Sequence, residues 1–525
     1  MKKFGLALFI AILILGKLSF GQDNLETTNN MSDSRIIFPR PFAFAIDDLG
    51  WNIGNDEGYD DNQGPYRIGV DRKMDINDYK CMVAVAEEVG VRLQALFIMG
   101  EMDRENVLAK CPGSNRFGAQ WDNSVHVNNS QIEIMDYVTN NAAYLEFGIH
   151  GLMHEYWSEP EKRTRAEWYD IDNNKARSTE IMQDHIQCFK AIMAQYGITK
   201  QNGHSFPQSF VPCAYAYHWN PDGEVSTGLL MHNEGVKYVN TLFSEIPELN
   251  PPSEANGGGI DHGVLVLNRV NYGNEWFDLS ALPSVPIEEQ ESDVIEAHWS
   301  NWLAQDAFLQ EETNNKWIEY YRMVQQQKNR YVAKNTEQFY AQWLYKKYTI
   351  VTEEEPGTVI IDNAVMPDEM YQNELLGNLV LKVKLTDGQH ISGANIDGNN
   401  MAAYFEEGGY GFIYLSELAQ KRYVLKYKTG PALPEKYIWH DGTFNVYNFY
   451  SDENETRTEI RLYGKQKLTF NGVRNPDEIK IENPDIKLLE TKYNTELKKL
   501  TLTLSAKDMQ GETSEIVLFY RKNHY

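Results

Sequence analysis

Apolar residues in the first part of the chain fall into two alternating patterns. Short apolar runs typical of buried strands occur at "PFAFAIDDLGW" (41–51), "VRLQALFIMG" (91–100), "YLEFGI" (144–149), "HSFPQSFVPCAYAY" (204–217) and "GVLVLNRV" (263–270). Between them, residues 75–90, 130–142 and 174–197 have the apolar spacing of helices. The first helical segment begins at Asp75 and ends at Gly90, which are typical helix boundaries. Strands that alternate with helices predict an α/β barrel or a layered α/β fold.

The pattern changes after residues 310–350, which have helical spacing over most of their length. Further on, apolar and polar residues alternate between Gly, Asn and Asp turns, for example in "RYVLKYKTG" (422–430) and "LTLTLSAKD" (500–508). Such alternation is typical of antiparallel strands with one solvated face. We therefore expect an α/β domain over residues 38–350 and an all-β, sandwich-like domain over residues 355–525.

Residues 1–21 have the three parts of a secretory signal peptide. Lys2 and Lys3 provide a positive start, a short apolar run follows, and small residues precede the expected cleavage after Gly21. The apolar run is too short to cross a membrane comfortably, no cysteine follows it as a lipid anchor, and no later segment has the length of a transmembrane helix. The sequence therefore predicts an exported protein, periplasmic, cell-surface or extracellular, with a flexible polar leader at residues 22–37.

The chain is acidic, with a formal net charge of −26 at pH 7. Removal of the signal peptide takes away three lysines and no acidic residue, so the mature chain is more acidic still. An acidic surface repels phosphate backbones, and nucleic acid is therefore not an expected partner. The 11 Trp and 31 Tyr suit contacts with the faces of sugar rings, although aromatic side chains also fill cores.

Four cysteines, Cys81, Cys111, Cys188 and Cys213, are spread over the chain. Export permits disulfide formation, and four cysteines allow three pairings, among which the spacing does not choose. No two of them form a C-x-x-C pair, so a cysteine-based zinc site is not expected.

The run "FGIHGLMHEYW" (147–157) places two histidines four residues apart at the end of an apolar strand. With 12 histidines in 525 residues, roughly 0.3 pairs at this spacing arise by chance, so the pair alone is weak evidence. The spacing brings His150 and His154 to one side of a helical turn or tight loop, where neutral imidazoles can bind zinc. The alternative is two ordinary polar residues at a strand-to-loop junction.

Two further strand ends carry residues that could complete such a site. In "AIDDLGW", Asp47 and Asp48 would point to opposite faces of a regular strand, but a turn would let one bind a metal and the other face a bound water. In "SDVIEAHWSNW", His298 ends a short apolar run and could act as a general acid. The alternatives are an Asp-rich turn or helix cap, and a histidine packed beside Trp299.

Taken in order, "FAIDDLG", "HGLMH" and "VIEAH" resemble the motifs of the polysaccharide deacetylase superfamily, metal-dependent carbohydrate esterases with a distorted (β/α) barrel. The resemblance extends from the first predicted strand to about residue 305. It implies that Asp48, His150 and His154 bind one divalent metal ion, with zinc expected. It also implies that Asp47 is the catalytic base and that His298 protonates the leaving amine or alcohol. The metal would polarise the acyl carbonyl and lower the pKa of its water.

Three features depart from the family pattern. The segment between Asp48 and His150 is unusually long, and residues 54–71 are expected to belong to an insertion next to the site. Val211, in "FVPCAY", stands where the family has an arginine that orients the catalytic aspartate. Leu49 follows the aspartates where glycine is usual. These departures indicate a remote branch of the family.

The sequence therefore predicts an exported, metal-dependent hydrolase that removes acetyl groups from a polysaccharide, an oligosaccharide or peptidoglycan. The aromatic residues expected near sugar rings are Trp51, Tyr215, Tyr217, Trp219, Trp299 and Trp302. One alternative is a glycoside hydrolase or lyase, for which Asp47 with Glu101, Asp103 or Glu155 could supply the two carboxylates. The other is a glycan-binding protein with a decayed esterase site, which the missing arginine favours and the retained ligands oppose.

Overall fold

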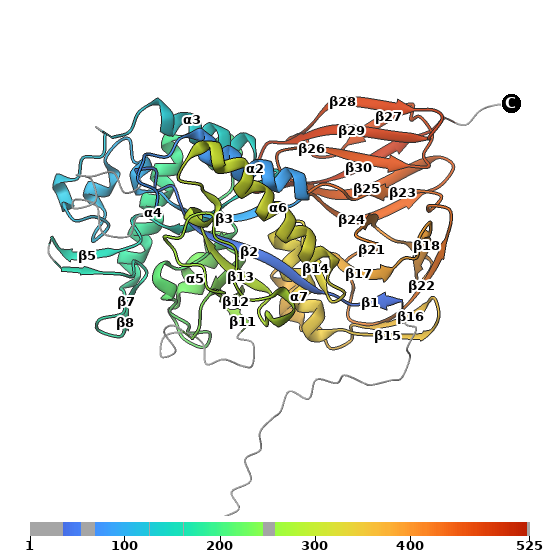
Figure 1. The fold of residues 1–525 in the computed structure, drawn as a ribbon, viewed down its shortest axis with the longest axis horizontal. Helices are drawn as coiled ribbons and strands as arrows, with labels where there is room; N and C mark the ends of the chain where they lie inside the picture. Colours follow the sequence, from blue (N-terminus) through green and yellow to red (C-terminus); the bar gives the residue numbers. More distant parts are fainter. Residues whose placement is uncertain (1–34, 54–68, 125, 161, 245–257, 522–525) are drawn as a thin grey trace, which may run out of the picture. The chain divides into compact units, whose positions relative to one another are not determined.

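The computed structural model describes residues 35–53, 69–124, 126–160, 162–244 and 258–521. In this part of the chain, seven parallel strands close into a barrel (Figure 1). The barrel strands are β2 (Arg40–Leu49), β3 (Leu93–Ile98), β4 (Leu145–Gly151), β9 (Ser209–Phe210), β10 (Tyr238–Thr241), β12 (Val264–Val270) and β13 (Val294–His298). They pair in the order β10, β9, β4, β3, β2, β13, β12, and the pairing of β12 with β10 closes the ring. The predicted barrel is therefore confirmed.

Two shorter strands extend the barrel sheet: β14 (Arg330–Val332) runs parallel to the start of β2, and β11 (Gly258–Asp261) runs antiparallel to β12. Because the seven barrel strands are parallel, their carboxyl ends meet at one end of the barrel. Barrel enzymes of this kind carry their chemistry at that end. We call it the carboxyl end below.

Helices accompany the barrel strands (Figure 1). They are α2 (Ile76–Val89), α3 (Asn129–Asn140), α4 (Thr179–Gln195), α5 (Thr227–His232), α6 (Gln310–Gln326) and α7 (Thr336–Tyr348). The boundary signals of α2 act as expected, because Asp75 and Asp78 form a capping box and Gly90 ends the helix in the left-handed conformation. Residues 310–350 are mostly helical, but β14 separates α6 from α7. Within the described residues, every helix is too short or too polar to span a membrane.

Short elements occupy the connections around the barrel. Two small hairpins consist of β5 (Tyr156–Glu159) with β6 (Lys162–Thr164) and β7 (Tyr169–Asp170) with β8 (Lys175–Ala176). The 3-10 helices are η1 (Gly100–Met102), η2 (Val107–Lys110), η3 (Gly118–Gln120), η4 (Lys200–Asn202), η5 (Cys213–Tyr215), η6 (Ile287–Glu289), η7 (Trp299–Trp302) and η8 (Ala307–Leu309).

The C-terminal region consists of largely antiparallel sheets of eight, five and four described strands. After β15 (Ile350–Glu355) and β16 (Thr358–Asp362), α8 (Asp368–Gln372) is the one helix among the described residues there. The remaining strands are β17 (Leu379–Lys384), β18 (His390–Ile396), β19 (Asn399–Asn400), β20 (Ala403–Glu407), β21 (Tyr410–Leu415), β22 (Arg422–Gly430), β23 (Tyr437–Trp439), β24 (Asn445–Ser451), β25 (Glu455–Leu462), β26 (Lys465–Asn471), β27 (Glu478–Ile481), β28 (Ile486–Asn494), β29 (Lys499–Ala506) and β30 (Glu512–Phe519). The predicted change to antiparallel sheets is confirmed, and it begins at Ile350, slightly before the expected boundary.

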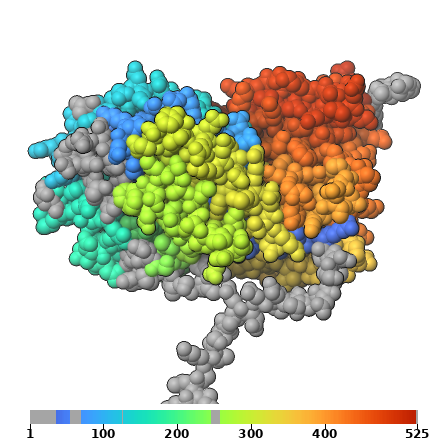
Figure 2. All heavy atoms as spheres, viewed as in Figure 1, coloured from blue at the N-terminus to red at the C-terminus, as the bar shows by residue number. Residues whose placement is uncertain are grey.

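The first described strand belongs to the C-terminal sheets. β1 (Ile36–Ile37), at the end of the segment expected to be a leader, pairs antiparallel with β17. Figure 2 shows this stretch as a blue patch beside orange atoms of the C-terminal region. The expected signal peptide and the first part of the leader lie outside the described residues.

Hydrogen bonds join the barrel strands to the C-terminal sheets. Arg92, just before β3, donates to the carbonyl oxygen of Met509 at 3.0 Å. Gln510 donates to the carbonyl oxygen of Phe147, in β4, at 2.9 Å. A buried apolar cluster that includes Leu96 and Leu265 of the barrel continues into these sheets.

Candidate metal centre and catalytic residues

β-Bulges at the carboxyl ends of β2 and β4 change the directions in which the predicted site residues point. The pairing of β2 with β3 shifts at Asp47 and Asp48, and the pairing of β4 with β3 shifts at His150. Such bulges re-aim side chains and are common next to active sites. Asp48 and His154 also have positive φ angles of 69° and 67°, which non-glycine residues rarely adopt. The bulge lets two adjacent carboxylates reach in two directions, Asp47 toward β12 and Asp48 toward β4.

Asp48 and His150 face each other with unshared lone pairs. The Nδ1 atom of His150 donates to the carbonyl oxygen of Val211 at 2.8 Å. The Nε2 atom then lies 3.5 Å from Oδ1 of Asp48. This carboxylate oxygen is buried and has no hydrogen-bond partner among the described residues. A shared proton, or a metal ion bound to both atoms, would relieve the repulsion between these lone pairs.

The separation fits a metal ion better than a proton. A charge-assisted N–H···O hydrogen bond is about 2.7–2.9 Å long. The nitrogen and oxygen ligands of a tetrahedral zinc ion are about 3.4 Å apart. Burial also raises the pKa of Asp48, because nothing nearby fully compensates its negative charge. A divalent cation at this position would supply the missing compensation.

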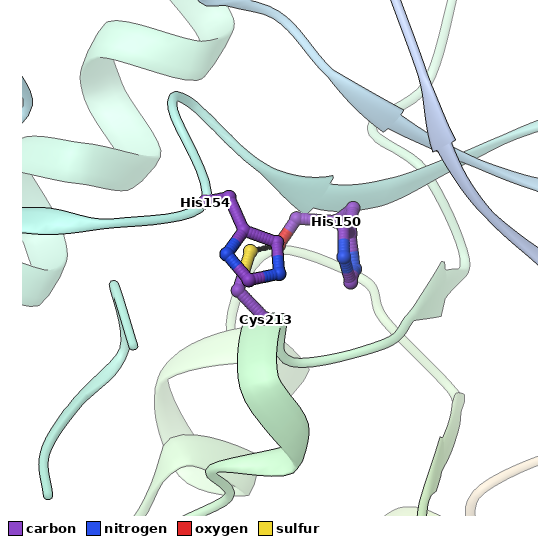
Figure 3. Close-up of side chains that lie close together, drawn as sticks. All are labelled: His150, His154 and Cys213. Atoms are coloured by element: carbon purple, nitrogen blue, oxygen red, sulfur yellow. Dashed lines mark hydrogen bonds between the residues drawn. The ribbon is translucent and has the colours of Figure 1, made fainter. Parts of the chain in front are cut away.

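His154 and Cys213 lie beside His150 (Figure 3). The rings of His150 and His154 have centroids 5.3 Å apart, and burial lowers the pKa of His154 well below its ordinary value. Its imidazole is therefore neutral, which is the form that binds metals. The possible ligand atoms of His150, His154 and Cys213 all lie within 4.8 Å of one another. The structure thus places Cys213 among the possible metal ligands, which the spacing of the cysteines in the sequence did not predict.

The residues offer two donor sets for one divalent ion, because either Asp48 or Cys213 could join the two histidines. The Cys213 thiol already donates to the carbonyl oxygen of His150 at 3.1 Å, and burial raises its pKa. The facing oxygen of Asp48 lacks a hydrogen bond among the described residues. Cys213 is thus placed near both histidines, whereas Asp48 approaches His150 at 3.5 Å and offers the unengaged ligand atom.

Glu167 holds the loop between the two histidines. Its carboxylate accepts hydrogen bonds from the backbone amides of Leu152 at 2.8 Å and Met153 at 3.2 Å. It is also 2.9 Å from Nδ1 of His185 in α4. A Cβ atom at Gly151 would come within 2.4 Å of the same carboxylate, so the approach requires glycine at that position. Partners of this kind fix metal-binding loops, and no motif in the sequence singled out Glu167.

Asp47 forms a bidentate ion pair with Arg269 of β12. The two guanidinium nitrogens donate to the two carboxylate oxygens at 2.9 and 2.5 Å, and both side chains are buried. Burial acts to raise the pKa of Asp47, but the charge of Arg269, the charges of His150 and His298 and the hydrogen bonds from Arg269 outweigh burial and lower the pKa to about 2. Asp47 is therefore an oriented anion at neutral pH.

Arg269 pairs with Asp47 from a position other than Val211, where the family resemblance leads one to expect an arginine. Val211 is fully buried, and its backbone carbonyl fixes His150 instead. Arg269 comes from a different strand, yet it orients Asp47 in the way that a bidentate guanidinium can. The sequence did contain a signal, because Arg269 is a charged residue near the end of the otherwise apolar run "VLVLNRV".

His298 lies beside Asp47, because β13 is the neighbour of β2 and the two residues are in register. Its Nε2 atom is 3.6 Å from Oε1 of Glu296, and the Tyr215 hydroxyl donates to the same oxygen at 2.8 Å. The other oxygen of Glu296 lies 3.5 Å from Nε of Arg269. Possible ligand atoms of Asp47, Glu296 and His298 lie within 4.8 Å of one another, and Arg269 already supplies positive charge to this group.

Most of the expected sugar-stacking residues are buried. The exposed fractions are 1% for Trp51, 0% for Tyr217, 0% for Trp299 and 1% for Trp302. Their ring faces pack in the apolar core of the barrel region, which leaves none open for a sugar. Tyr215 and Trp219 are the two of the six that are partly exposed.

The alternative carboxylates have anchoring contacts. Glu101 accepts hydrogen bonds from the backbone amides of Asn52 and Ile53 at 2.7 and 2.9 Å. Asp103 accepts one from the backbone amide of Leu108 at 3.0 Å. Glu155 lies 3.3 Å from the guanidinium of Arg163. All three carboxylates are buried, and they hold loops at the carboxyl end.

The expected insertion at residues 54–71 falls outside the described residues except at its end. A cavity of about 940 Å³ is lined in part by Gln208 and Lys237, which directly precede β9 and β10. This cavity is therefore at the amino ends of those strands, whereas the candidate metal centre is at the carboxyl end.

Neither a protein-family model nor a curated protein matches this chain.

Proposed function

We propose that this protein is an exported, metal-dependent hydrolase that removes acetyl groups from a carbohydrate polymer. In this proposal its barrel is a remote version of the polysaccharide deacetylase barrel, and the C-terminal sheets form a sandwich-like accessory domain. The observation that carries the proposal is the buried pair of Asp48 and His150, whose facing atoms are 3.5 Å apart. Their separation and unmet charge suit one divalent ion, with zinc expected.

The residues divide the chemistry between two groups. Asp48, His150 and His154 would hold the ion, which when bound supplies Lewis acidity to the acyl carbonyl and to the attacking water. Asp47, held ionised and oriented by Arg269, would accept the proton that the water loses. His298 would deliver a proton to the leaving oxygen or nitrogen as the acyl bond breaks.

The low pKa of Asp47 limits how long this residue can hold the proton from the water. A carboxylate with a pKa of about 2 is a weak base, so a proton on Asp47 is held only briefly. The proton must therefore pass on to the leaving group during the reaction. His298 is in register with Asp47 on the neighbouring strand, which makes it the group placed to receive or supply that proton.

Two observations weigh against a glycosidase. Glu101, Asp103 and Glu155 hold loops through the contacts described above. Glu296 does lie near Asp47, but both carboxylates contact the same buried guanidinium and do not flank an open cleft. Paired glycosidase carboxylates stand on either side of the sugar bond. The presence of Arg269 also removes the main argument for a decayed esterase site.

Product analysis tests the proposal. Purified mature protein with added zinc is incubated with a panel of acetylated glycans, and both free acetate and new reducing ends are measured. The proposal predicts acetate without new reducing ends, and loss of acetate release in Asp48→Asn. New reducing ends without acetate would show a glycosidase instead. Glycan binding with neither product would show a binding protein.

A further inference from the structure

The four cysteines divide into one contacting pair and two separate thiols. Cys111 follows η2, in the segment after β3, and Cys188 lies in α4. The Cys188 thiol lies near enough to raise the pKa of the Cys111 thiol, and the carbonyl oxygen of Pro112, next to Cys111, lies 2.7 Å from the ring of His185, one turn before Cys188. The Cys81 thiol instead donates to the carbonyl oxygen of Asp78 at 2.9 Å, and the Cys213 thiol donates to the backbone near the candidate metal centre. Of the six possible bonds between two of these cysteines, this arrangement supports only the one that joins Cys111 to Cys188.

Neighbouring contacts hold the two cysteine segments together. The imidazole Nε2 of His185, one turn before Cys188, is 2.7 Å from the carbonyl oxygen of Pro112, which follows Cys111. Further along α4, Gln195 donates to Asp103 at 3.0 Å and accepts from the backbone amide of the next residue at 2.6 Å. The segment is therefore fixed to the helix on both sides of the thiols. A disulfide needs its two cysteines close together, and these contacts hold the two segments side by side.

We propose that Cys111 and Cys188 form a disulfide when the protein meets a thiol-oxidising environment, and that Cys81 and Cys213 remain thiols. The oxidant would be another disulfide, either a small-molecule disulfide such as oxidised glutathione or the disulfide of a protein oxidoreductase. Cys188 is partly exposed and Cys111 is buried, so an oxidant reaches Cys188 first.

The exchange balances in two steps. The Cys188 thiolate attacks one sulfur of the oxidant, the oxidant's S–S bond breaks, and one thiol leaves. The Cys111 thiolate then attacks the Cys188 sulfur of the mixed disulfide and releases the second thiol. One protein S–S bond forms, two S–H protons end on the two released thiols, and the oxidant takes up the two electrons.

The disulfide would stiffen the support of the candidate metal centre. It would covalently join the segment after β3 to α4. In α4, His185 also contacts Glu167, which holds the loop between the two histidines. Cross-linking mainly restricts the unfolded chain, so the oxidised protein should melt at a higher temperature than the reduced protein.

Peptide mapping tests the pairing. The mature chain, kept zinc-free with a chelator, is equilibrated with oxidised and reduced glutathione. It is then quenched in acid, unfolded, alkylated with N-ethylmaleimide and digested without reductant. We expect one linked pair of peptides that carries Cys111 and Cys188, with the maleimide on Cys81 and Cys213. Alkylation of both Cys111 and Cys188, or linkage of either one to another cysteine, would overturn the proposal.

A melting experiment provides a second readout. Oxidation should raise the melting temperature of the original chain and of Cys81→Ser, the matched control, by the same amount. It should not raise the melting temperature of Cys188→Ser. An equal rise in Cys188→Ser would overturn the proposal even where the digest is incomplete. Neither readout depends on hydrolase activity, so failure here leaves the proposed function untouched.

Discussion

Replacement of Arg269 by methionine tests whether this arginine compensates two buried carboxylates. Methionine fills much of the same volume but carries no charge and donates no hydrogen bond. It would leave Asp47 and Glu296 without the buried guanidinium that now contacts both. Removal of one partner from a buried ion pair typically destabilises a protein by about 3–5 kcal/mol. We expect a loss of this size in the free energy of unfolding at pH 7.

The pH dependence gives the more specific signature. Burial acts to raise the pKa of Asp47, but Arg269, His150 and His298 together lower it from 3.8 to about 2, and this net shift corresponds to about 2 kcal/mol of stability. This contribution is fully present above the unfolded pKa of 3.8 and is lost as the pH falls toward 2. Burial is already the largest single cause acting on this pKa, and without Arg269 its raising effect is opposed less. The pKa of Asp47 in the folded variant should therefore be higher, and the variant should lack the stability that the original chain gains as the pH rises from about 2 through 3.8. The difference in the free energy of unfolding should therefore grow over this pH range.

Urea unfolding at a series of pH values, with a chelator present to remove metal, measures both effects. Arg422→Met is the matched control, because Arg422 pairs with Glu354 at the exposed surface and its loss should cost less than about 1 kcal/mol. A cost for Arg269→Met as small as that of the control, or an unfolding difference that does not change with pH, would refute this account of Asp47.

Three further substitutions test the catalytic and supporting residues. Asp47→Asn should lower the rate of acetate release at least about 100-fold while zinc content stays the same, because it removes a base and not a ligand; a smaller loss would remove Asp47 from that role. His298→Ala should also lower the rate by about 10²–10⁴-fold with zinc retained, and a near-normal rate would show that another group protonates the leaving atom. Glu167→Gln should weaken zinc binding about 10–100-fold in competition with a chromophoric chelator, whereas Glu159→Gln, on the exposed surface of β5, should leave it unchanged.

Local signals in the sequence predicted the elements of the barrel well. The apolar runs correspond to β2, β3, β4 and β12, and the capping residues of α2 mark its ends. The three motifs fall at the carboxyl ends of parallel strands, and that placement follows from alternation of strands and helices alone. The strands, the helix ends and the positions of the motifs depend on residues close together in the chain, so the sequence alone can predict them.

The missed residues depend on contacts between distant segments. Arg269 and Asp47 are 222 positions apart, and they meet because β12 and β2 both pair with β13. The contact of Cys111 with Cys188 likewise depends on how the segment after β3 lies on α4. Burial of Trp299 and of most other candidate aromatic residues could not be read from composition, because aromatic side chains fill cores as readily as they bind sugars.

Anomalous X-ray diffraction at the zinc edge, from crystals of the mature protein grown with zinc, tests the central claim most directly. The account predicts one strong anomalous peak about 2.0–2.2 Å from Oδ1 of Asp48, Nε2 of His150 and a ring nitrogen of His154. The same measurement on Asp48→Asn should show the peak weakened or lost. A peak bound by Cys213 in place of Asp48, a peak among Asp47, Glu296 and His298, or no peak at the carboxyl end of the barrel would contradict the account.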